Sequence, residues 1–315
     1  MLVKEITPTY IDHTPVMIEL LNIRHIQPHR HSDAIELLYC LEGNLHMTIA
    51  HEDLSLAAGE IVTVDHDDIH YMTADEDNTV LIIHIDMKNV GRKWQDIRYI
   101  FFSCATKLCK PHQQDALRSV YDIMLIMAYT YFSRTKNSEE TLHCMSMRLV
   151  DILLEKFSWF AVEGFTAEEN EKYRSRLNDI SAYLQQHYQE KITISQLAAK
   201  VHIDENYLSQ FMKRTSFLSF TFMVNYIRSY EAEKLLLFTD KSIQEISDLC
   251  GFSSVKYFHK YFKAAWETTP LQHKIKYRKI AAIPQSISTY ESGDALDIIK
   301  EDIVKRYVKQ NMYIT

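Results

Sequence analysis

Apolar residues in the first part of the chain form short runs that alternate with polar residues. Turn residues such as Gly43 and Gly59 separate these runs, which lie at residues 35–41, 45–50, 60–64 and 79–85. Alternation with a period of two is typical of strands that bury one face of a sheet. Residues from about 16 to 88 are therefore predicted to form a small β-barrel or β-sandwich.

From about residue 111 onward, the apolar residues recur with the period of an α-helix. Two stripes follow one another: Ala116, Val120, Ile123, Met124 and Met127 in the first, and Met147, Val150, Leu154 and Phe157 in the second. They predict two helices that pack on each other or on a second subunit. A further helical pattern runs from Leu177 to about Ile280. Beyond it, turn residues are frequent at 284–293, and a last amphipathic pattern follows.

These changes of pattern divide the chain into four parts. Residues 1–90 are predicted to be a β domain, residues 91–165 a helical segment for dimerisation and coupling, and residues 166–280 an all-helical domain. Residues 281–315 form a C-terminal extension to which the sequence assigns no role. The predicted fold class is multidomain α+β.

Two segments of the helical domain, residues 195–213 and 243–263, nearly repeat each other. Each has the pattern of a helix, a short turn and a second helix. In the first segment Thr193 or Ser195 is expected to cap the first helix, and Asp204 to cap the second. This pattern is typical of the helix-turn-helix motif, whose second helix enters the major groove of DNA.

The second segment follows the same plan and is joined to the first by a long helix. Ser242 is the expected cap, and Phe258 and Phe262 are expected to anchor the second helix in the core. The connecting residues 220–238 contain neither Gly nor Pro, and a helix of that length spans about 28 Å. Successive major-groove faces of B-DNA lie about 34 Å apart. One rigid helix could therefore hold both recognition helices on one face of DNA.

The charge is unevenly distributed along the chain. The formal net charge of -7 is unusual for a nucleic-acid binder. However, residues 1–90 carry 4 Lys and Arg against 16 Asp and Glu, whereas residues 171–280 carry 17 against 11. Only the helical domain has the positive charge expected of a domain that contacts phosphates.

The cysteines and the apolar runs exclude several classes of protein. Five cysteines without a Cys-x-x-Cys pair argue against a disulfide framework and a structural zinc finger. The apolar runs are too short to cross a bilayer, and no leader pattern precedes the β domain. We therefore expect a soluble cytoplasmic protein.

Particular residues of the two repeated segments match a known family. They are Ile194-Ser-Gln-Leu-Ala, Tyr207-Leu-Ser, Ser242-Ile-Gln-Glu-Ile, Cys250-Gly-Phe-Ser, and Tyr257-Phe-His-Lys-Tyr-Phe-Lys263 followed by Thr269-Pro270. On these motifs, residues from about 177 to 278 resemble the DNA-binding domain of the AraC/XylS family of bacterial transcription regulators. The resemblance implies a DNA-binding domain with two helix-turn-helix units.

The same resemblance implies which side chains meet DNA. Base-reading positions of the first unit fall on Asn206, Ser209 and Gln210. Those of the second unit fall on Val255, Lys256, His259 and Lys260. Positions better placed for phosphates fall on Lys213, Arg214 and Lys263, and phosphate contacts position a protein without specifying sequence.

Three positions depart from the family pattern. The Gly usual in the first turn is His202, so a positive φ at that position would strain the backbone. The Gly expected after each recognition helix is Phe217 in the first unit and Glu267 in the second. These helices are therefore expected to end without the usual glycine cap.

A cluster of chemically active residues is predicted in the β domain. His29 and His31 alternate on one strand, so both imidazoles point to the same face, and Glu36 and His70 are expected to join them from neighbouring strands. Three imidazoles and a carboxylate suit a mononuclear metal ion. The pattern resembles the cupin fold, and the resemblance implies a cupin-like β-barrel whose metal ligands would be these four residues.

The cupin resemblance leaves other roles open for these residues. The second cupin motif matches weakly, because its usual Pro and Gly are Asp65 and Asp67. The histidines could instead hydrogen-bond an organic ligand or cap strand ends, with Arg24 adding positive charge to a polar lining. A divalent metal is therefore one of two interpretations of the barrel.

Together these patterns predict a sequence-specific, DNA-binding transcription regulator that responds to a small-molecule effector in the barrel, with a sugar as the suggested class. The implied partners are double-stranded DNA, a second copy of the chain in a homodimer, and RNA polymerase if the protein activates transcription. Effector binding is expected to act through the helices of residues 111–160. The main interpretation is not an enzyme. The alternatives are a metal-dependent cupin enzyme and a DNA-binding protein without an effector.

Overall fold

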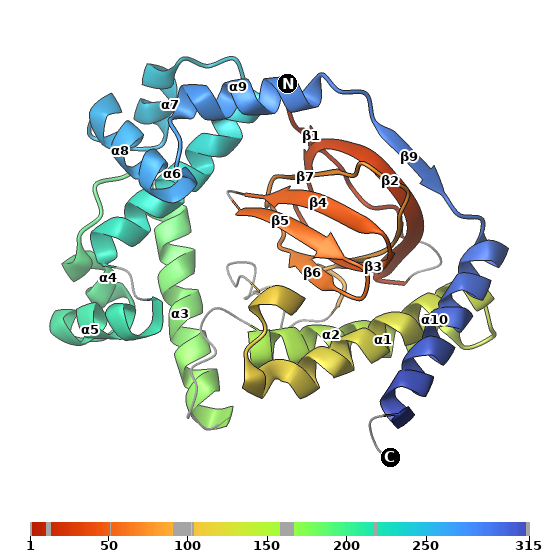
Figure 1. The fold of residues 1–315 in the computed structure, drawn as a ribbon. Coiled ribbons are helices and arrows are strands. Elements are labelled where there is room, and N and C mark those ends of the chain that lie inside the picture. Colours follow the sequence, from red (N-terminus) through yellow and green to blue (C-terminus); the bar gives the residue numbers. More distant parts are fainter. Residues whose placement is uncertain are drawn as a thin grey trace. The chain divides into compact units, whose positions relative to one another are not determined.

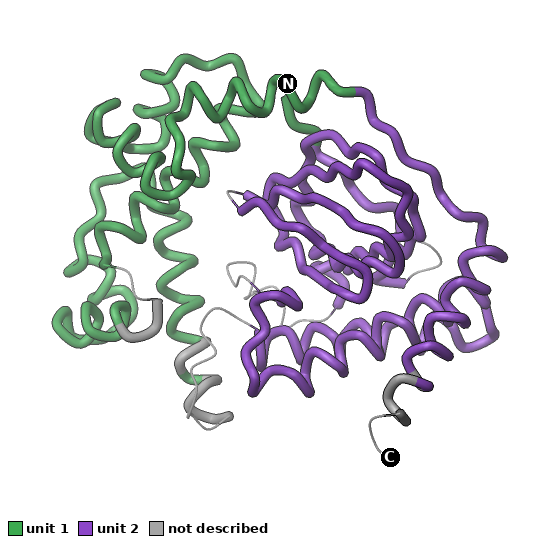
Figure 2. The backbone as a smooth tube through the Cα atoms, viewed as in Figure 1, with its two compact units in different colours: residues 1–4, 159–283 green, residues 5–158, 284–315 purple. Residues whose placement is uncertain are grey.

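The computed structural model describes residues 2–10, 14–50, 52–90, 102, 104–157, 167–216 and 219–312. The chain divides into two compact units (Figure 2). The first, which we call the barrel unit, consists of residues 5–158 and 284–315, and the second, the helical unit, consists of residues 1–4 and 159–283. None of the described helices is long and apolar enough to cross a membrane.

The strands of the barrel unit form one antiparallel sheet that curls into a nearly closed barrel (Figure 1). They are β1 (Lys4–Glu5), β2 (Val16–Arg30), β3 (Ala34–Glu42), β4 (Asn44–Ile49), β5 (Glu52–Ala57), β6 (Ile61–Val64), β7 (His70–Thr73) and β8 (Thr79–Asp86). Their order in the sheet is β5-β4-β7-β2-β8-β3-β6, and β1 pairs with β2. The predicted barrel is confirmed.

Alternation along the strands fills the barrel with apolar side chains. Leu38, Leu45, Met47 and Met72 belong to one buried cluster. The turn between β3 and β4 requires glycine, because Gly43 has a φ of +80° and a Cβ there would lie 2.7 Å from the carbonyl oxygen of Asp77. The turn residues of the sequence therefore end strands where the pattern predicts.

Two long helices follow the barrel. They are α1 (Gln114–Ser133) and α2 (Ser138–Ile152), which runs on through a π-helical turn at Leu153–Phe157. Short 3-10 turns at Thr106–Leu108 and Pro111–Gln113 precede them. α1 and α2 pack on each other, as one of the two sequence interpretations predicts. Arg134 ends α1 with a left-handed φ of 46°.

The C-terminal extension returns to the barrel. Residues 284–293 were expected to be turn-rich, but Ser286–Thr289 form strand β9, which pairs with β2 through Leu21–Thr289 and Ile23–Ile287. β9 pairs with the part of β2 that comes just before the part paired with β7. It therefore covers backbone groups of β2 that would otherwise be exposed at a sheet edge. α10 (Ser292–Met312) then packs against α1.

Polar contacts fix α10 on the outside of the barrel. Tyr39 alternates with the core residue Leu38 on β3 and faces outward. Its hydroxyl donates to Asp302 of α10 at 2.9 Å, and Arg306 lies over the Tyr121 ring of α1 at 4.0 Å from the ring centroid. In the sequence, residues 159–283 of the helical unit thus lie between two segments that belong to the barrel unit.

The helical unit contains α3 (Ala167–His187), α4 (Ile194–Lys200), α5 (Glu205–Ser216), α6 (Phe220–Phe238), α7 (Ile243–Leu249), α8 (Val255–Trp266) and α9 (Pro270–Ala281). The long helix α6 has the predicted bounds. Near the start of the chain, the amide of Leu2 donates to the carbonyl oxygen of Leu237 at the end of α6. The predicted all-helical domain with two helix-turn-helix units is confirmed.

The predicted caps set the helix boundaries. The Thr193 side chain accepts from the amide of Gln196, and Asp204 accepts from the amides of Asn206 and Tyr207. Ser242 and Ser254 cap α7 and α8 in the same way. Each of these oxygens satisfies an amide that the helix itself leaves without a partner.

Candidate barrel site and nucleic-acid interface

Four buried side chains meet inside the barrel. One nitrogen or oxygen atom from each of His29, His31, Glu36 and His70 lies within 4.8 Å of the others. His29 faces His70 across the pairing of β2 with β7, and Glu36 comes from β3. The structure thus brings together the four residues that the sequence predicts, and we call them the barrel cluster.

Backbone carbonyl groups fix the orientation of the three imidazoles. The Nδ1 atoms of His29, His31 and His70 lie 2.9 Å, 2.7 Å and 2.9 Å from the carbonyl oxygens of Gln27, Ile6 and Asp68. A carbonyl oxygen can only accept, so each Nδ1 donates its hydrogen. A neutral imidazole then carries a free lone pair on Nε2. This is how metal-binding histidines are usually held.

The Nε2 lone pairs converge on the carboxylate of Glu36. The Oε2 atom of Glu36 lies 2.8 Å from Nε2 of His70 and 3.4 Å from Nε2 of His31. Burial acts to raise the pKa of Glu36, but His70, His31 and His84 outweigh it and hold that pKa well below its usual range. The cluster therefore contains a buried negative charge.

The histidines differ in how readily they accept a proton. Burial and the neighbouring His70 lower the pKa of His29 well below its ordinary value. Burial acts in the same direction on His31, but the carboxylate of Glu36 beside it raises its pKa overall. Neutral imidazole is the form that binds metals.

The donor atoms of the cluster need a positive charge among them. Nε2 of His31, Nε2 of His70 and Oε2 of Glu36 are buried without a partner of good hydrogen-bond geometry. Two lone pairs 2.8 Å apart repel unless a proton or a cation lies between them. Three imidazole nitrogens and one carboxylate oxygen are ligands that divalent transition metals accept. The residues present therefore fit a metal ion.

Arg24 lies apart from the barrel cluster. Its guanidinium contacts the carbonyl oxygen of Asp75 and pairs with Asp77 at 3.2 Å, and its side chain is 41% exposed. These partners lie in the turn between β7 and β8. The positive charge suggested for the lining is therefore directed to the barrel surface.

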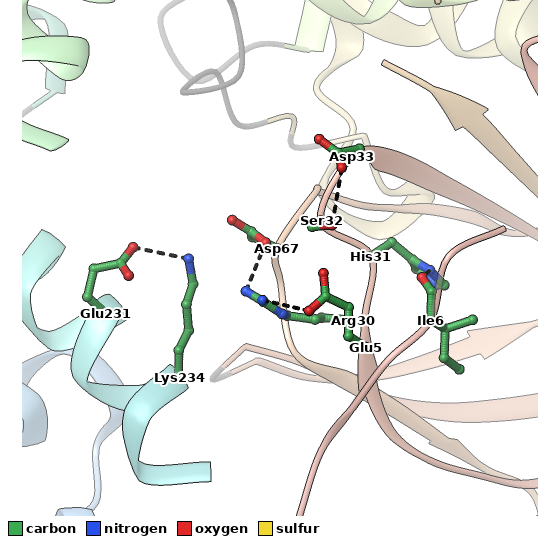
Figure 3. Close-up of polar contacts among 9 residues, drawn as sticks. All are labelled: Glu5, Ile6, Arg30, His31, Ser32, Asp33, Asp67, Glu231 and Lys234. Atoms are coloured by element: carbon green, nitrogen blue, oxygen red, sulfur yellow. Dashed lines mark hydrogen bonds and ion pairs between the residues drawn. The ribbon is translucent and has the colours of Figure 1, made fainter. Parts of the chain in front are cut away.

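The start of the chain contacts the barrel beside His31 of the barrel cluster (Figure 3). Arg30 pairs with Glu5 at 3.1 Å and with Asp67 at 3.0 Å, and the amide of Ile6 donates to the carbonyl oxygen of Arg30. Ile6 also accepts from His31 of the barrel cluster. Asp67, which stands where cupins usually have Gly, thus helps to hold the N-terminal segment.

The residues predicted to read DNA lie on the outer faces of α5 and α8. Exposed side chains are Asn206, Gln210 and Lys213 on α5 and Lys256, Lys260 and Lys263 on α8, while Ser209, Val255 and His259 are partly exposed. The side chain of Arg214 lies outside the described residues. Leu208, Met212, Phe258 and Phe262 face the core on the opposite sides of these helices.

Two exposed tyrosines belong to the same faces and were not predicted as site residues. Tyr207 and Tyr257 occupy the same place relative to their caps, and each is 48% exposed. Nζ of Lys260 lies 6.0 Å from the Tyr257 ring centroid, and Arg176 of α3 donates to the Tyr207 hydroxyl at 2.9 Å. The equivalent positions of the tyrosines in the two motifs could have identified them.

Two of the positions that depart from the family pattern, His202 and Glu267, have left-handed backbone. His202 in the first turn has a φ of 53°, whereas Gly251 in the second turn has a φ of 74°. Glu267 ends α8 with a φ of 54°, so the left-handed cap is kept without glycine. Phe217 lies outside the described residues. The first turn therefore carries the strain that the sequence predicts for a non-glycine residue.

A buried ion pair joins the connecting helix to the last helix of the unit. Nε2 of His273 on α9 lies 2.7 Å from Oε1 of Glu233 on α6, and the side chains are 4% and 1% exposed. This pair escaped sequence analysis, because its members lie on separate helices. It fixes α9 on the helix that joins the two helix-turn-helix units.

Comparisons with known proteins agree with this division of the chain. A cupin domain model matches residues 21–86, and a helix-turn-helix domain model matches residues 197–274. The first range contains the barrel cluster, and the second contains both α5 and α8.

Several bacterial proteins resemble the chain over most of its length. An uncharacterized HTH-type transcriptional regulator of Staphylococcus aureus (strain MRSA252) is 22% identical over 238 residues, which cover 75% of this chain and 31% of that protein. The uncharacterized HTH-type transcriptional regulator YisR of Bacillus subtilis (strain 168) is 25% identical, with 78% of this chain and 86% of that protein covered. The structure of ToxT from Vibrio cholerae is 13% identical, with 83% and 97% of the two chains covered and a TM-score of 0.42. The match to the staphylococcal protein covers less than a third of that protein's length.

Proposed function

Because the chain joins a cupin domain to an AraC-type helix-turn-helix domain and so belongs to the AraC/XylS family, we propose that occupancy of its barrel controls its binding to specific DNA sequences. The chain is a DNA-binding regulator. The proposal adds the effector, the coupling and the target-reading residues.

The exposed faces of α5 and α8 are proposed to read successive major grooves. Lys256 and Lys260 can donate to guanine, and Asn206 and Gln210 can pair with adenine. Lys213 and Lys263 are proposed to contact phosphates. The second unit is expected to dominate specificity, because two of its proposed base-reading residues are exposed lysines, whereas His202 strains the turn of the first unit.

The observation that carries the effector proposal is the barrel cluster. Its buried, fixed donors favour a divalent metal ion, alone or with a small anion bound to it, as the ligand that the barrel senses. His29, His31, Glu36 and His70 would hold the ion. When bound, the ion would supply positive charge to the carboxylate and an open position for a further ligand. A sugar is the competing effector class.

A thermal-shift experiment separates the two ligand classes. Purified full-length protein, stripped with chelator, is heated with Ni²⁺, Co²⁺, Zn²⁺ or a set of sugars. A metal effector raises the melting temperature of wild type but not of His31→Ala, since only bound ligand stabilises the folded state. Stabilisation by a sugar with no response to metal would contradict the metal proposal.

The N-terminal segment offers a physical route from the barrel to the helical unit. The amide of Leu2 is hydrogen-bonded to the end of α6, and the carbonyl oxygen of Ile6 is hydrogen-bonded to His31 of the barrel cluster. We propose that ligand binding changes the His31 to Ile6 contact and so the hold of this segment on α6. Such coupling requires different ligand affinities in the two arrangements.

A homodimer is proposed to form through α1 and α2. Ile126 and Tyr129 of α1 and Met147 of α2 are 46%, 41% and 39% exposed. Paired DNA-binding domains gain specificity from paired sites. Sedimentation of wild type against Ile126→Glu measures this step. RNA polymerase is a proposed partner if the protein activates transcription.

A metal-dependent enzyme is the second candidate function, because the same four donors could hold a catalytic ion. The main proposal assigns them a sensing role instead, and the protein's relatives bear the names of transcriptional regulators. Turnover of an oxidisable or isomerisable metabolite by the metal-loaded protein, lost in His31→Ala, would favour the enzyme.

A further inference from the structure

A fourth histidine faces the barrel cluster. We propose that His84 is an additional metal donor, which makes the site suited to divalent ions that take five or six ligands. This inference rests on the proposed metal-binding role of the barrel. It adds His84 to the four residues that the cupin resemblance implies.

The pairing of strands places His84 beside the carboxylate of the cluster. His84 lies on β8 directly opposite Glu36 on β3. Side chains directly opposite each other on paired strands share one face of the sheet. The His84 ring centroid lies 4.7 Å from that of His31, and the residue is only 5% exposed.

The distance from His84 to the carboxylate oxygen of Glu36 is compatible with a shared ion. Donor atoms about 2.1 Å from one ion lie about 3.0 Å apart at right angles and about 4.2 Å apart on opposite sides. Nε2 of His84 lies 3.9 Å from Oε2 of Glu36, which falls within this range. The corresponding distances for His70 and His31 are 2.8 Å and 3.4 Å. One carboxylate oxygen thus faces three imidazole nitrogens at distances close to those of one coordination sphere.

His84 is buried beside the carboxylate of Glu36. Its Nδ1 atom is buried without a hydrogen-bond partner. Burying that nitrogen without a partner is costly, so core packing alone does not favour a histidine at this position. The other ring nitrogen, Nε2, is the one that faces Glu36.

Four imidazoles and one carboxylate select among metals. Structural zinc sites are almost always four-coordinate and tetrahedral. Five protein donors would instead suit Ni²⁺, Co²⁺, Fe²⁺ or Mn²⁺, which also accept water or a small anion as a further ligand. The barrel would thus sense such an ion, or an oxyanion bound at its open position.

The test uses full-length protein and Co²⁺, whose visible absorption is strong in tetrahedral sites and weak in five- or six-coordinate sites. Wild type is compared with His84→Gln and His84→Ala. His25→Ala is the matched control, because His25 is also a buried histidine, 4% exposed, on a barrel strand. Affinity is measured by competition with a chelator, and circular dichroism checks that each variant is folded.

We expect wild type to bind one Co²⁺ with weak visible bands. In the His84 variants the affinity falls at least tenfold and the bands strengthen toward the four-coordinate pattern, while His25→Ala behaves as wild type. Equal affinity and spectrum in wild type and folded His84→Gln would overturn the role of His84 alone. Failure of wild type to bind Co²⁺ would overturn the proposed metal site itself.

Discussion

Arg306 connects the C-terminal extension to the barrel, so replacing it measures how much this extension stabilises the barrel unit. Nε of Arg306 donates to the Tyr39 hydroxyl at 3.2 Å, and the guanidinium lies 4.0 Å from the centroid of the Tyr121 ring. Asp302, one turn earlier, lies 3.8 Å away. Arg306→Ala removes these contacts and leaves the Tyr39 hydroxyl hydrogen-bonded to Asp302.

The expected loss follows from the burial of these groups. The cation–π contact is worth about 1 kcal/mol, because Arg306 is only 24% exposed. The hydrogen bond to the hydroxyl contributes about 1 kcal/mol, and the partly exposed pair with Asp302 less than that. We expect Arg306→Ala to lower the free energy of unfolding of the barrel unit by about 2 kcal/mol.

Urea unfolding of the full chain, followed by tryptophan fluorescence, measures this loss. Lys305→Ala is the matched control, because Lys305 is 71% exposed and its nearest carboxylate lies 3.7 Å away. The control should change stability by less than about 0.5 kcal/mol. The rate of amide hydrogen exchange in residues 292–312 should rise in Arg306→Ala but not in Lys305→Ala. Equal stability of the two variants would refute the view that Arg306 fixes α10 on the barrel.

Three further predictions concern the helical unit, the DNA interface and pH. His273→Ala should cost the helical unit about 3 to 5 kcal/mol in a denaturation experiment, since it leaves Glu233 buried and unpaired. The paired change Glu233→Met with His273→Leu should cost much less, and equal costs would contradict a buried ion pair. Lys260→Ala and Gln210→Ala should each weaken specific DNA binding by about 1 to 3 kcal/mol, whereas Lys263→Ala should weaken specific and random DNA alike. Equal loss of both in Lys260→Ala would show a phosphate contact only. Metal-free protein should lose stability as the pH falls from about 6.5 toward 4, because the lowered pKa values of His29 and His84 let the unfolded state bind more protons. His31, whose pKa is raised, contributes in the opposite direction. His84→Gln should reduce this slope, and a melting temperature that rises on acidification would contradict the assignment.

Local signals in the sequence were enough to predict most helices and strands. The helix α6 has the bounds that its unbroken pattern predicts, and Asp204 and Ser242 cap helices as expected. Caps and periodicity act within a few residues of chain. A single sequence therefore carries this information.

Contacts between distant segments could not be predicted in the same way. The pairing of β9 with β2 joins residues far apart in the chain, and Ser286–Thr289 are all exposed, so no alternation of buried and exposed residues marks them as a strand. The ion pair of Glu233 and His273 likewise depends on how α6 and α9 pack.

At the barrel cluster, some residues could be predicted from the sequence and one could not. The alternation of His29 and His31 predicts a shared face, and the cupin resemblance adds Glu36 and His70. His84 carries no such motif, and it faces the cluster only because β8 pairs with β3 in a register that sets it opposite Glu36. Register depends on the whole sheet, so this histidine could be identified only from the structure.

The measurement that tests the account most directly is the DNA affinity of the full chain with and without metal. DNA selected by the protein from a random pool is titrated by fluorescence anisotropy in the presence of chelator and again with Co²⁺ or Ni²⁺. The account predicts an affinity change of at least about fivefold in wild type, as typical allosteric coupling gives. No change is expected in His31→Ala. Equal affinity of wild type in both conditions, while the metal is shown to be bound, would contradict the claim that the barrel cluster controls DNA binding.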